Sequence, residues 1–262
     1  MKTRVLIFSG YGLNCEEETA YGFTLAGAST DIVHINDVID GRVKLKDYQI
    51  LAFPGGFSYG DDTGSGKAYA NRVRNHLGKE LKDFLKRDTP RQSRGKLIIG
   101  ICNGFQILTQ LGLLPGALTF NDSNRYIDRW VDLKPEGDSP WLRGIEKLSV
   151  PIAHGEGKFI ADKKTLAELK KKKQVAFRYV KGETSTYQDL PANPNGAMEN
   201  IAGVLSHKGR VLGMMPHPDR HLFSIQRPDW PLLKEQAKRA GTLLPEHGQG
   251  LQIFKNGVEY FR

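Results

Sequence analysis

The chain has 262 residues, of which 39% are apolar and 29 are glycine, and its formal net charge is +9. This length fits one large domain or two small ones, and the composition is that of a globular protein, which excludes disorder as the main state. No apolar run approaches the roughly 18 residues that a membrane span needs. The first ten residues lack the long apolar region and the cleavage site of a signal peptide, so we expect a cytoplasmic protein.

The excess of basic residues is scattered along the chain. Its one dense run, Lys170 to Lys173, contains no aromatic residue. This pattern argues against nucleic acid as a partner and favours a solvated surface or docking to an acidic protein. Only two cysteines occur, Cys15 and Cys102, which are too few for a disulfide framework.

The first half of the chain alternates apolar runs with helical patterns. Short apolar runs predict buried strands at residues 5–8, 31–35, 49–53 and 96–101. Apolar spacings of three and four predict helices from an N-cap at Asn14 to Ala26, over residues 67–87, and over residues 104–111. Strands that alternate with helices through short links predict parallel pairing, right-handed crossovers and an α/β fold.

The second half has a looser pattern. Strands are predicted at residues 150–153, 175–179, 201–206 and 211–215, and a last helix is indicated by Leu251, Phe254, Val258 and Phe261. The proline- and glycine-bearing stretch 182–196 is typical of a surface loop rather than of a linker between domains. We therefore expect a single domain over residues 1–262.

Residues 100–104 (GICNG) carry the strongest indication of chemistry. They follow a predicted strand and precede a predicted helix, which is the setting of the nucleophile elbow with the pattern G-x-S-x-G. Glycines flank such a tight turn because side chains would clash there, and a helix N-terminus stabilises a thiolate. A free cysteine is more often a small buried hydrophobic residue, as we expect for Cys15, but the setting of Cys102 favours catalysis.

A thiolate that attacks an acyl carbon needs a base and a group that orients this base. Among seven histidines, His217 follows the predicted strand 211–215 and so lies at the edge where open α/β sheets place their sites. Pro216 and Pro218 stiffen its loop, and Asp219 can reach the second ring nitrogen. A lone histidine is usually a surface or core residue, but these neighbours favour a catalytic base.

Donors for the developing oxyanion are expected from the turn 54–61, whose glycines allow backbone N–H groups to point at a small ligand. Taken alone, this segment is equally well interpreted as an ordinary glycine-rich turn. The N–H group of Asn103 would supply a second donor. Neither a Walker A pattern nor the spacing G-x-G-x-x-G is present, and the histidines share no metal-ligand spacing. We expect neither a nucleotide site nor a metal in this chain.

The motifs P-G-G, G-x-C-x-G and H-P-D, in this order, resemble those of glutamine amidotransferase domains with a Cys-His-Glu triad. Longer segments resemble the glutaminase subunits of phosphoribosylformylglycinamidine synthase, an enzyme of purine biosynthesis. These segments are residues 53–61 (FPGGFSYGD), 100–106 (GICNGFQ), 151–157 (PIAHGEG), 193–196 (NPNG) and 213–218 (GMMPHP). The resemblance covers nearly the whole chain and implies a flavodoxin-like fold of the class I amidotransferase type, with an open, mostly parallel sheet flanked by helices.

The resemblance implies a role for each matched residue. Cys102 attacks the side-chain amide of glutamine, which gives a glutamyl thioester and ammonia. His217 takes the thiol proton and later serves the leaving amine and the attacking water, while Asp219 has the third triad position. Backbone N–H groups near Gly56 and Asn103 hold the oxyanion. Three further residues are expected near the glutamine pocket: Gln106, His154 and Glu156.

The resemblance also implies partners. Ammonia would pass to a synthetase subunit, which uses ATP and magnesium to convert formylglycinamide ribonucleotide to the amidine, and a small third subunit would bridge the two. We expect no cofactor in this chain itself, and neither nucleic acid nor a membrane as a partner.

Two segments depart from the family pattern. Asp219 stands where the family usually has glutamate, so the carboxylate is one methylene closer to its backbone, and residues 62–67 are also less typical. The alternative functions are a cysteine hydrolase or peptidase of the same broad fold and a non-catalytic binding module that has kept the fold.

Overall fold

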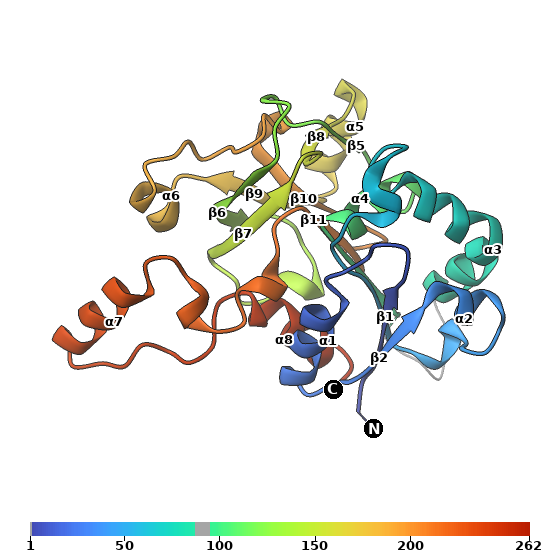
Figure 1. The fold of residues 1–262 in the computed structure, drawn as a ribbon, viewed down its shortest axis with the longest axis horizontal. Coiled ribbons are helices and arrows are strands. Elements are labelled where there is room, and N and C mark those ends of the chain that lie inside the picture. The colour runs from blue at the N-terminus through green and yellow to red at the C-terminus, as the bar shows by residue number, and fades with distance from the viewer. Residues whose placement is uncertain (1, 87–94) are drawn as a thin grey trace.

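The structure is a computed structural model that describes residues 2–86 and 95–262. Its centre is a sheet with the strand order β2-β1-β3-β4-β11-β10-β9-β6-β7 (Figure 1). The strands of this sheet are β1 (Arg4–Ser9), β2 (Ser29–His34), β3 (Ile50–Phe53), β4 (Leu97–Ile101), β6 (Ile127–Pro135), β7 (Leu148–His154), β9 (Val175–Val180), β10 (Ile201–Ser206) and β11 (Val211–Met214). Two short strands, β5 (Ala117–Thr119) and β8 (Lys158–Ile160), pair beside it.

The half of the sheet that bears the site is parallel. β1 pairs with β2 on one side and with β3 on the other, β3 pairs with β4, and β4 pairs with β11. Almost all residues of β1, β3, β4 and β11 are buried. Strands that are covered on both faces need apolar side chains at every position, which explains the continuous apolar runs in the sequence. Because parallel strands end at one edge, residues that follow β3, β4 and β11 come together there.

The other half of the sheet is antiparallel. β10 pairs with β11 and β9, and β6 pairs with β9 and β7. The prediction of an α/β fold with an open sheet flanked by helices is confirmed. The parallel pairing runs from β2 to β11, and the strands β10, β9, β6 and β7 extend the sheet by antiparallel pairing. β6 was not predicted, because its nine residues mix exposed charges with tryptophan and proline and do not alternate strictly.

The helices are α1 (Glu16–Leu25), α2 (Ile35–Ile39), α3 (Lys67–Leu85), α4 (Asn103–Gln110), α5 (Lys163–Lys171), α6 (Glu183–Tyr187), α7 (Trp230–Arg239) and α8 (Leu251–Glu259). The chain steps from β1 to β2 in one direction and from β3 to β4 in the other. Right-handed crossovers therefore place α1 and α3 on opposite faces of the sheet. α8 packs against α1 through the rings of Phe23 and Phe254, 4.9 Å apart, and α4 packs against α3.

The apolar spacing in α3 is confirmed, since every predicted core position in it is buried, and residue 87, its predicted end, lies outside the described residues. The N-cap predicted at Asn14 is wrong. α1 begins after Cys15, and the backbone N–H of Asn14 instead donates to the carbonyl of Gly55, 3.2 Å away. The hydrogen bond of Asn14 to the loop after β3 therefore takes the place of a side-chain cap on α1.

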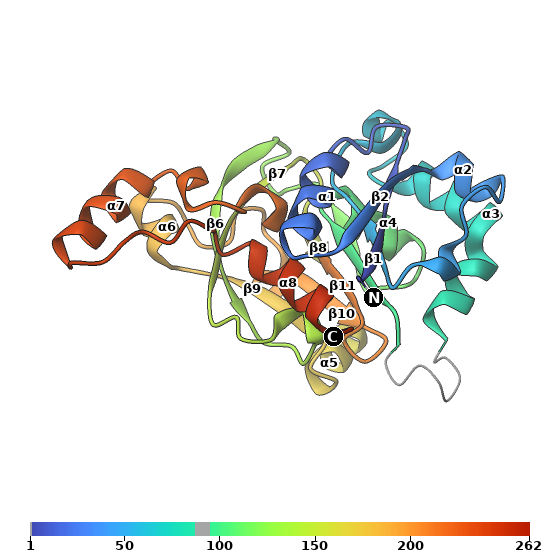
Figure 2. The ribbon, with the colours of Figure 1, turned by 90° about the horizontal axis from the view of Figure 1, so that it is seen from below.

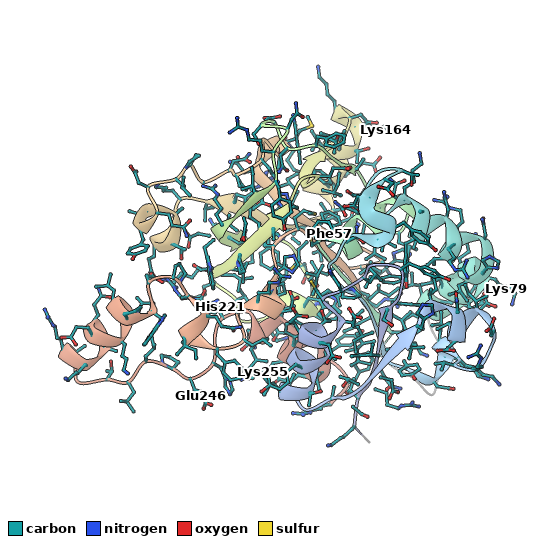
Figure 3. All side chains as sticks on the ribbon, in the orientation of Figure 1. Phe57, Lys79, Lys164, His221, Glu246 and Lys255 are labelled. Carbon is teal, nitrogen blue, oxygen red and sulfur yellow. The ribbon has the colours of Figure 1, made fainter. Side chains whose placement is uncertain are left out.

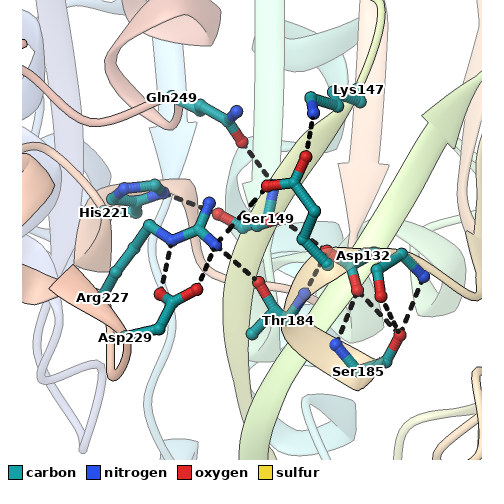
Figure 4. A network of polar contacts seen from close by, with 11 residues as sticks. Asp132, Lys147, Ser149, Thr184, Ser185, His221, Arg227, Asp229 and Gln249 are labelled. Carbon is teal, nitrogen blue, oxygen red and sulfur yellow. Dashed lines mark hydrogen bonds and ion pairs between the residues drawn. The ribbon is translucent and has the colours of Figure 1, made fainter. Parts of the chain in front are cut away.

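The predicted surface loop 182–196 is partly wrong. It contains α6, whose Thr184 and Ser185 are buried and donate hydrogen bonds to the carboxylate of Asp132 on β6 (Figure 4). No apolar pattern marks this short helix in the sequence, because polar contacts rather than apolar burial hold it.

α7 lies at the far end of the molecule, away from the sheet, and has no buried residue (Figure 2). None of the helices formed by the described residues is long and apolar enough to cross a membrane.

Gly104, the second residue of α4, brings this helix into contact with β3. A Cβ atom at residue 104 would lie 1.9 Å from the carbonyl oxygen of Phe53, which belongs to the backbone and cannot rotate away. Only glycine therefore lets the helix begin where it does.

We predict that Gly104→Ala destabilises the fold by about 2–3 kcal/mol or more, because the added methyl group overpacks a backbone contact. The measurement is urea unfolding. Gly78→Ala is the matched control: this glycine lies inside α3 with nothing within 4 Å of the new Cβ, so the same substitution should stabilise by about 0.5–1 kcal/mol. Equal effects at the two positions would contradict the packing argument.

Candidate active site

Cys102 lies on a strained turn between β4 and α4. Its φ is +50° and its ψ is −107°, and its backbone N–H donates to the carbonyl of Met214 in β11, 2.8 Å away. A Cβ atom at Gly100 would lie 2.6 Å from the carbonyl oxygen of Gly104, so both flanking glycines are sterically required. The elbow predicted from the sequence is confirmed as a geometry, and it holds the thiol at the carboxyl edge of the parallel strands.

His217 follows β11, and its loop is fastened to β7. The backbone N–H of His217 donates to the carbonyl of Pro151 at 2.8 Å, and His221 donates from Nδ1 to the carbonyl of Ser149 at 2.6 Å. These two bonds hold both ends of the loop against one strand, so the imidazole has little freedom to move.

A polar network supports the far end of this loop (Figure 4). Arg227 donates two hydrogen bonds to the Asp229 carboxylate, at 2.8 and 2.7 Å, and a third to the hydroxyl of Thr184 in α6. Ser149 connects this region to β6 by donating its hydroxyl to Asp132, 2.6 Å away. Removing one partner of such a buried charge pair would destabilise the fold, because the other charge would remain buried and unpaired. The network therefore holds the segment around Arg227 and Asp229, which follows the site, in place.

The structure brings Cys102, His217 and Asp219 together. The Cys102 side chain lies close enough to the His217 ring to raise its pKa, and its Sγ lies 3.7 Å from the carbonyl oxygen of Ala153. On the other side of the ring, Nδ1 lies 3.3 Å from Oδ1 and 3.4 Å from Oδ2 of Asp219. All three side chains are buried, as a thiol–imidazole–carboxylate triad requires.

The charge distribution favours a protonated His217. Burial disfavours the imidazolium, but the negative charges of Asp219 and Cys102 and their hydrogen bonds favour it, and together they raise the pKa of His217 to about 10. The imidazole of His217 is therefore protonated at neutral pH. Since the pKa of His217 is raised above that of the unfolded chain, this pairing stabilises the fold fully below about pH 6.5 and is lost as the pH rises towards 10.

The loop after β3 lies against the imidazole. A Cβ atom at Gly55 would be 2.6 Å from Cε1 of His217, so the glycine permits the close approach, and Gly56 has a φ of +146°, which favours glycine. The backbone N–H groups of Gly56 and Asn103 have no acceptor among the described residues. Both groups are thus available to an oxyanion.

Asn103 and Gln106 make internal contacts at the start of α4. The Asn103 amide accepts from the backbone N–H of Ser58 at 3.1 Å and donates to Oε1 of Gln106 at 2.7 Å. Gln106 in turn donates to the backbone carbonyl of Glu156 at 2.6 Å, and the Glu156 carboxylate accepts from the N–H of Ser65 at 3.4 Å. These side chains join three loops around the elbow.

His154, predicted near the glutamine pocket, is buried at the end of β7. Its Nδ1 lies 3.1 Å from the amide oxygen of Asn121, and its Nε2 has no partner among the described residues. Burial, and then the charge of His217, lower the pKa of His154 to about 3, so the ring is neutral.

Several residues at the site were not singled out by sequence reasoning. Asn121 orients His154, and Arg220 donates from Nη2 to Sγ of Cys15 at 3.2 Å. The rings of Phe57 and Tyr126, 6.1 Å apart, are exposed, and Figure 3 shows Phe57 at the centre of this face. Of these residues, only Arg220 could have been noticed in the sequence, because it directly follows the H-P-D motif.

Comparison with known proteins places this geometry in a family. The model of the CobB/CobQ-like glutamine amidotransferase domain matches residues 2–261. The chain is 53% identical to phosphoribosylformylglycinamidine synthase subunit PurQ of Methanococcus maripaludis strain C5, over 100% of this chain and 99% of that protein. It is 40% identical to the subunit PurQ of Dehalococcoides mccartyi, over 100% and 98% of the two chains.

The chain belongs to the PurQ family. The prediction of a glutaminase subunit of phosphoribosylformylglycinamidine synthase is thereby confirmed. Among solved structures, PurLQS from Thermotoga maritima matches with a TM-score of 0.73 and 30% identity, over 100% of both chains. A glutamine amidotransferase from the same organism matches at 15% identity with a TM-score of 0.54, which shows the shared fold alone.

We predict that Cys102→Ala lowers the pKa of His217 from about 10, because the substitution removes a negative charge and a hydrogen bond that favour the imidazolium while burial continues to oppose it. NMR titration of the imidazole resonances measures this shift. His221, whose pKa burial lowers to about 4, serves as the internal reference and should not change. An unaltered His217 titration would show that the two residues do not interact.

Proposed function

We propose that the chain releases ammonia from glutamine by nucleophilic catalysis at Cys102, with His217 as acid and base and Asp219 as the orienting group. The observation that carries this proposal is the buried contact of the Cys102 thiol with an imidazole whose other nitrogen faces a carboxylate. Family membership supplies the substrate, since phosphoribosylformylglycinamidine synthase subunits named PurQ are similar to this chain over its full length.

The reaction begins when the thiolate of Cys102 attacks the side-chain amide carbon of glutamine. The carbonyl becomes an oxyanion, which accepts hydrogen bonds from the backbone N–H groups of Gly56 and Asn103. His217 gives its proton to the amide nitrogen, the carbon–nitrogen bond breaks, and ammonia leaves a glutamyl thioester. His217 then takes a proton from water, the resulting hydroxide attacks the thioester, and the carbon–sulfur bond breaks to give glutamate and the thiolate.

The third position of the triad is a shorter carboxylate than the family usually has. Both oxygens of Asp219 lie at 3.3 to 3.4 Å from Nδ1, so the carboxylate faces the ring edge and the charge interaction is retained. An orienting and charge-stabilising role tolerates this geometry, because it needs proximity to the imidazolium rather than bond formation.

The remaining predicted residues form the surroundings of the glutamine. Gln106 and Glu156 join the loops around the elbow, and Nε2 of neutral His154 is a buried acceptor without a partner. We assign these three residues to the walls that position the substrate.

The ammonia is consumed by a synthetase subunit in the same complex. The similar solved structure is that of PurLQS, a multi-subunit assembly, which supports a synthetase partner and a small bridging subunit for this chain. ATP and magnesium are assigned to the synthetase, where formylglycinamide ribonucleotide becomes the amidine. We place the reaction in the cytoplasm and treat residues 1–262 as one amidotransferase domain, which the single hydrophobic cluster from Val5 to Val258 supports. No specific observation favours the alternative functions, a peptidase or a non-catalytic module.

We predict that Cys102→Ala lowers glutamine-dependent amidine synthesis by at least about a thousandfold and spares synthesis from added ammonium, because only the nucleophile is lost. Both rates are measured in the complex with the synthetase, and native mass spectrometry verifies that the complex is intact. Cys15→Ala serves as the thiol control. Equal loss of both activities in an intact complex would overturn the proposed role.

We predict that Asp219→Asn lowers the glutaminase kcat by about a hundredfold to ten-thousandfold, since a neutral amide neither stabilises the imidazolium nor fixes the productive tautomer. Asp219→Glu keeps the charge and should retain far more activity than the amide variant. Steady-state glutaminase assays, again with the synthetase present, measure both. If the glutamate variant were as impaired as the asparagine variant, the charge would not be the property that matters.

A further inference from the structure

Cys15 lies beside the triad, although the mechanism gives it no part. Its Sγ, a ring nitrogen of His217 and a carboxylate oxygen of Asp219 all lie within 4.8 Å of one another, and all three residues are buried. Cys15 immediately precedes α1, whereas the other two follow β11, so the fold brings them together from opposite ends of the chain. A thiol, an imidazole and a carboxylate that face one point are the donor types that zinc prefers.

The Asp219 carboxylate leaves one acceptor unused. Its Oδ1 is buried and has no hydrogen-bond partner among the described residues, although it lies near the ring of His217. A buried carboxylate oxygen without a donor is costly, and a cation would satisfy it.

Glycine at position 55 allows the convergence of the thiol and the imidazole. A Cβ atom there would lie 2.6 Å from Cε1 of His217 and 3.3 Å from Sγ of Cys15, so any side chain would push these two groups apart. Ligand atoms around a tetrahedral zinc ion are about 3.5 Å apart, so side-chain movements of about one ångström would complete the site.

We propose that Cys15, His217 and Asp219 bind one zinc-type divalent ion, and that this ion inhibits the glutaminase. The ion takes the imidazole that Cys102 needs as its base. This second part rests on the proposed function, whereas the binding itself does not.

Arg220 supports the thiolate form that such an ion requires. Its Nη2 lies 3.2 Å from Sγ of Cys15, where an N–H donor stabilises a metal-bound thiolate from the outer shell. A cysteine must lose its thiol proton to become a metal ligand. Binding therefore releases the thiol proton, and the His217 proton where the ring is charged, to solvent. The thiolate and the carboxylate then balance the two charges of the ion.

The competing site is the pair Cys102 and His217, which would also attract a thiophilic metal. The two cysteines separate the possibilities, because each belongs to only one of them. Cys15→Ser and Cys102→Ser are matched substitutions of buried thiols and keep the side-chain shape.

The binding experiment uses the full chain, stripped with a chelator, and follows the ultraviolet charge-transfer band from thiolate to Cd²⁺, together with Zn²⁺ affinity in competition with a chromophoric chelator. We expect one equivalent to bind wild type and Cys102→Ser, and at least about a tenfold weaker affinity in Cys15→Ser. Binding that survives in Cys15→Ser and disappears in Cys102→Ser, or the absence of a charge-transfer band in wild type, would overturn the proposal. Cys15→Ala, checked for folding by circular dichroism, repeats the test should the serine variant unfold.

The activity experiment measures glutaminase in the complex over a Zn²⁺ titration, with each variant referred to its own metal-free rate. Wild type should be inhibited reversibly by chelator, and the inhibitory concentration should rise at least about tenfold in Cys15→Ser. Equal inhibition of both proteins would place the inhibitory ion on the catalytic thiol and contradict the proposal. A chain that bound the ion but lacked glutaminase activity would refute the proposed function and leave the metal site standing.

Discussion

The contact of one thiol with one imidazole is the constraint on which the rest of the site depends. Cys102 is presented by a turn with a positive φ, and His217 by a loop fastened to β7, so the two side chains meet because strands β4 and β11 are neighbours. Parallel pairing makes both chain segments leave the sheet at the same edge. Burial of the pair strengthens each charge interaction, since little water screens it.

This arrangement of the thiol and the imidazole depends on two places where glycine lets the backbone lie unusually close to its neighbours. Gly104 lets α4 start against Phe53, and Gly55 lets the loop after β3 lie against the imidazole. The same loop also lies beside Cys15, whose Sγ is within 4.8 Å of a ring nitrogen of His217. One geometry therefore supplies both the proposed catalytic contact and a second set of donors, which would compete for the same histidine.

The two halves of the sheet differ in what they carry. Cys102 and His217 follow strands of the parallel half of the sheet, while α6 and α7 extend from the antiparallel half and are held by the polar network around Arg227. A buried ion pair is a weak source of net stability, but removing one partner leaves an uncompensated charge and is strongly destabilising.

The sequence by itself determined the buried strands, the turn at Cys102 and the positions of His217 and Asp219 just after a strand, because these depend on local signals: apolar runs, glycine spacing and proline-flanked residues. Tertiary structure alone decided the rest. The backbone of Asn14 pairs with Gly55 instead of leaving the side chain to cap a helix, and α6 is held by Asp132 without an apolar face. The approach of Cys15 to His217 joins residues about two hundred positions apart, and no local pattern encodes such a contact, because it arises only when the sheet is assembled.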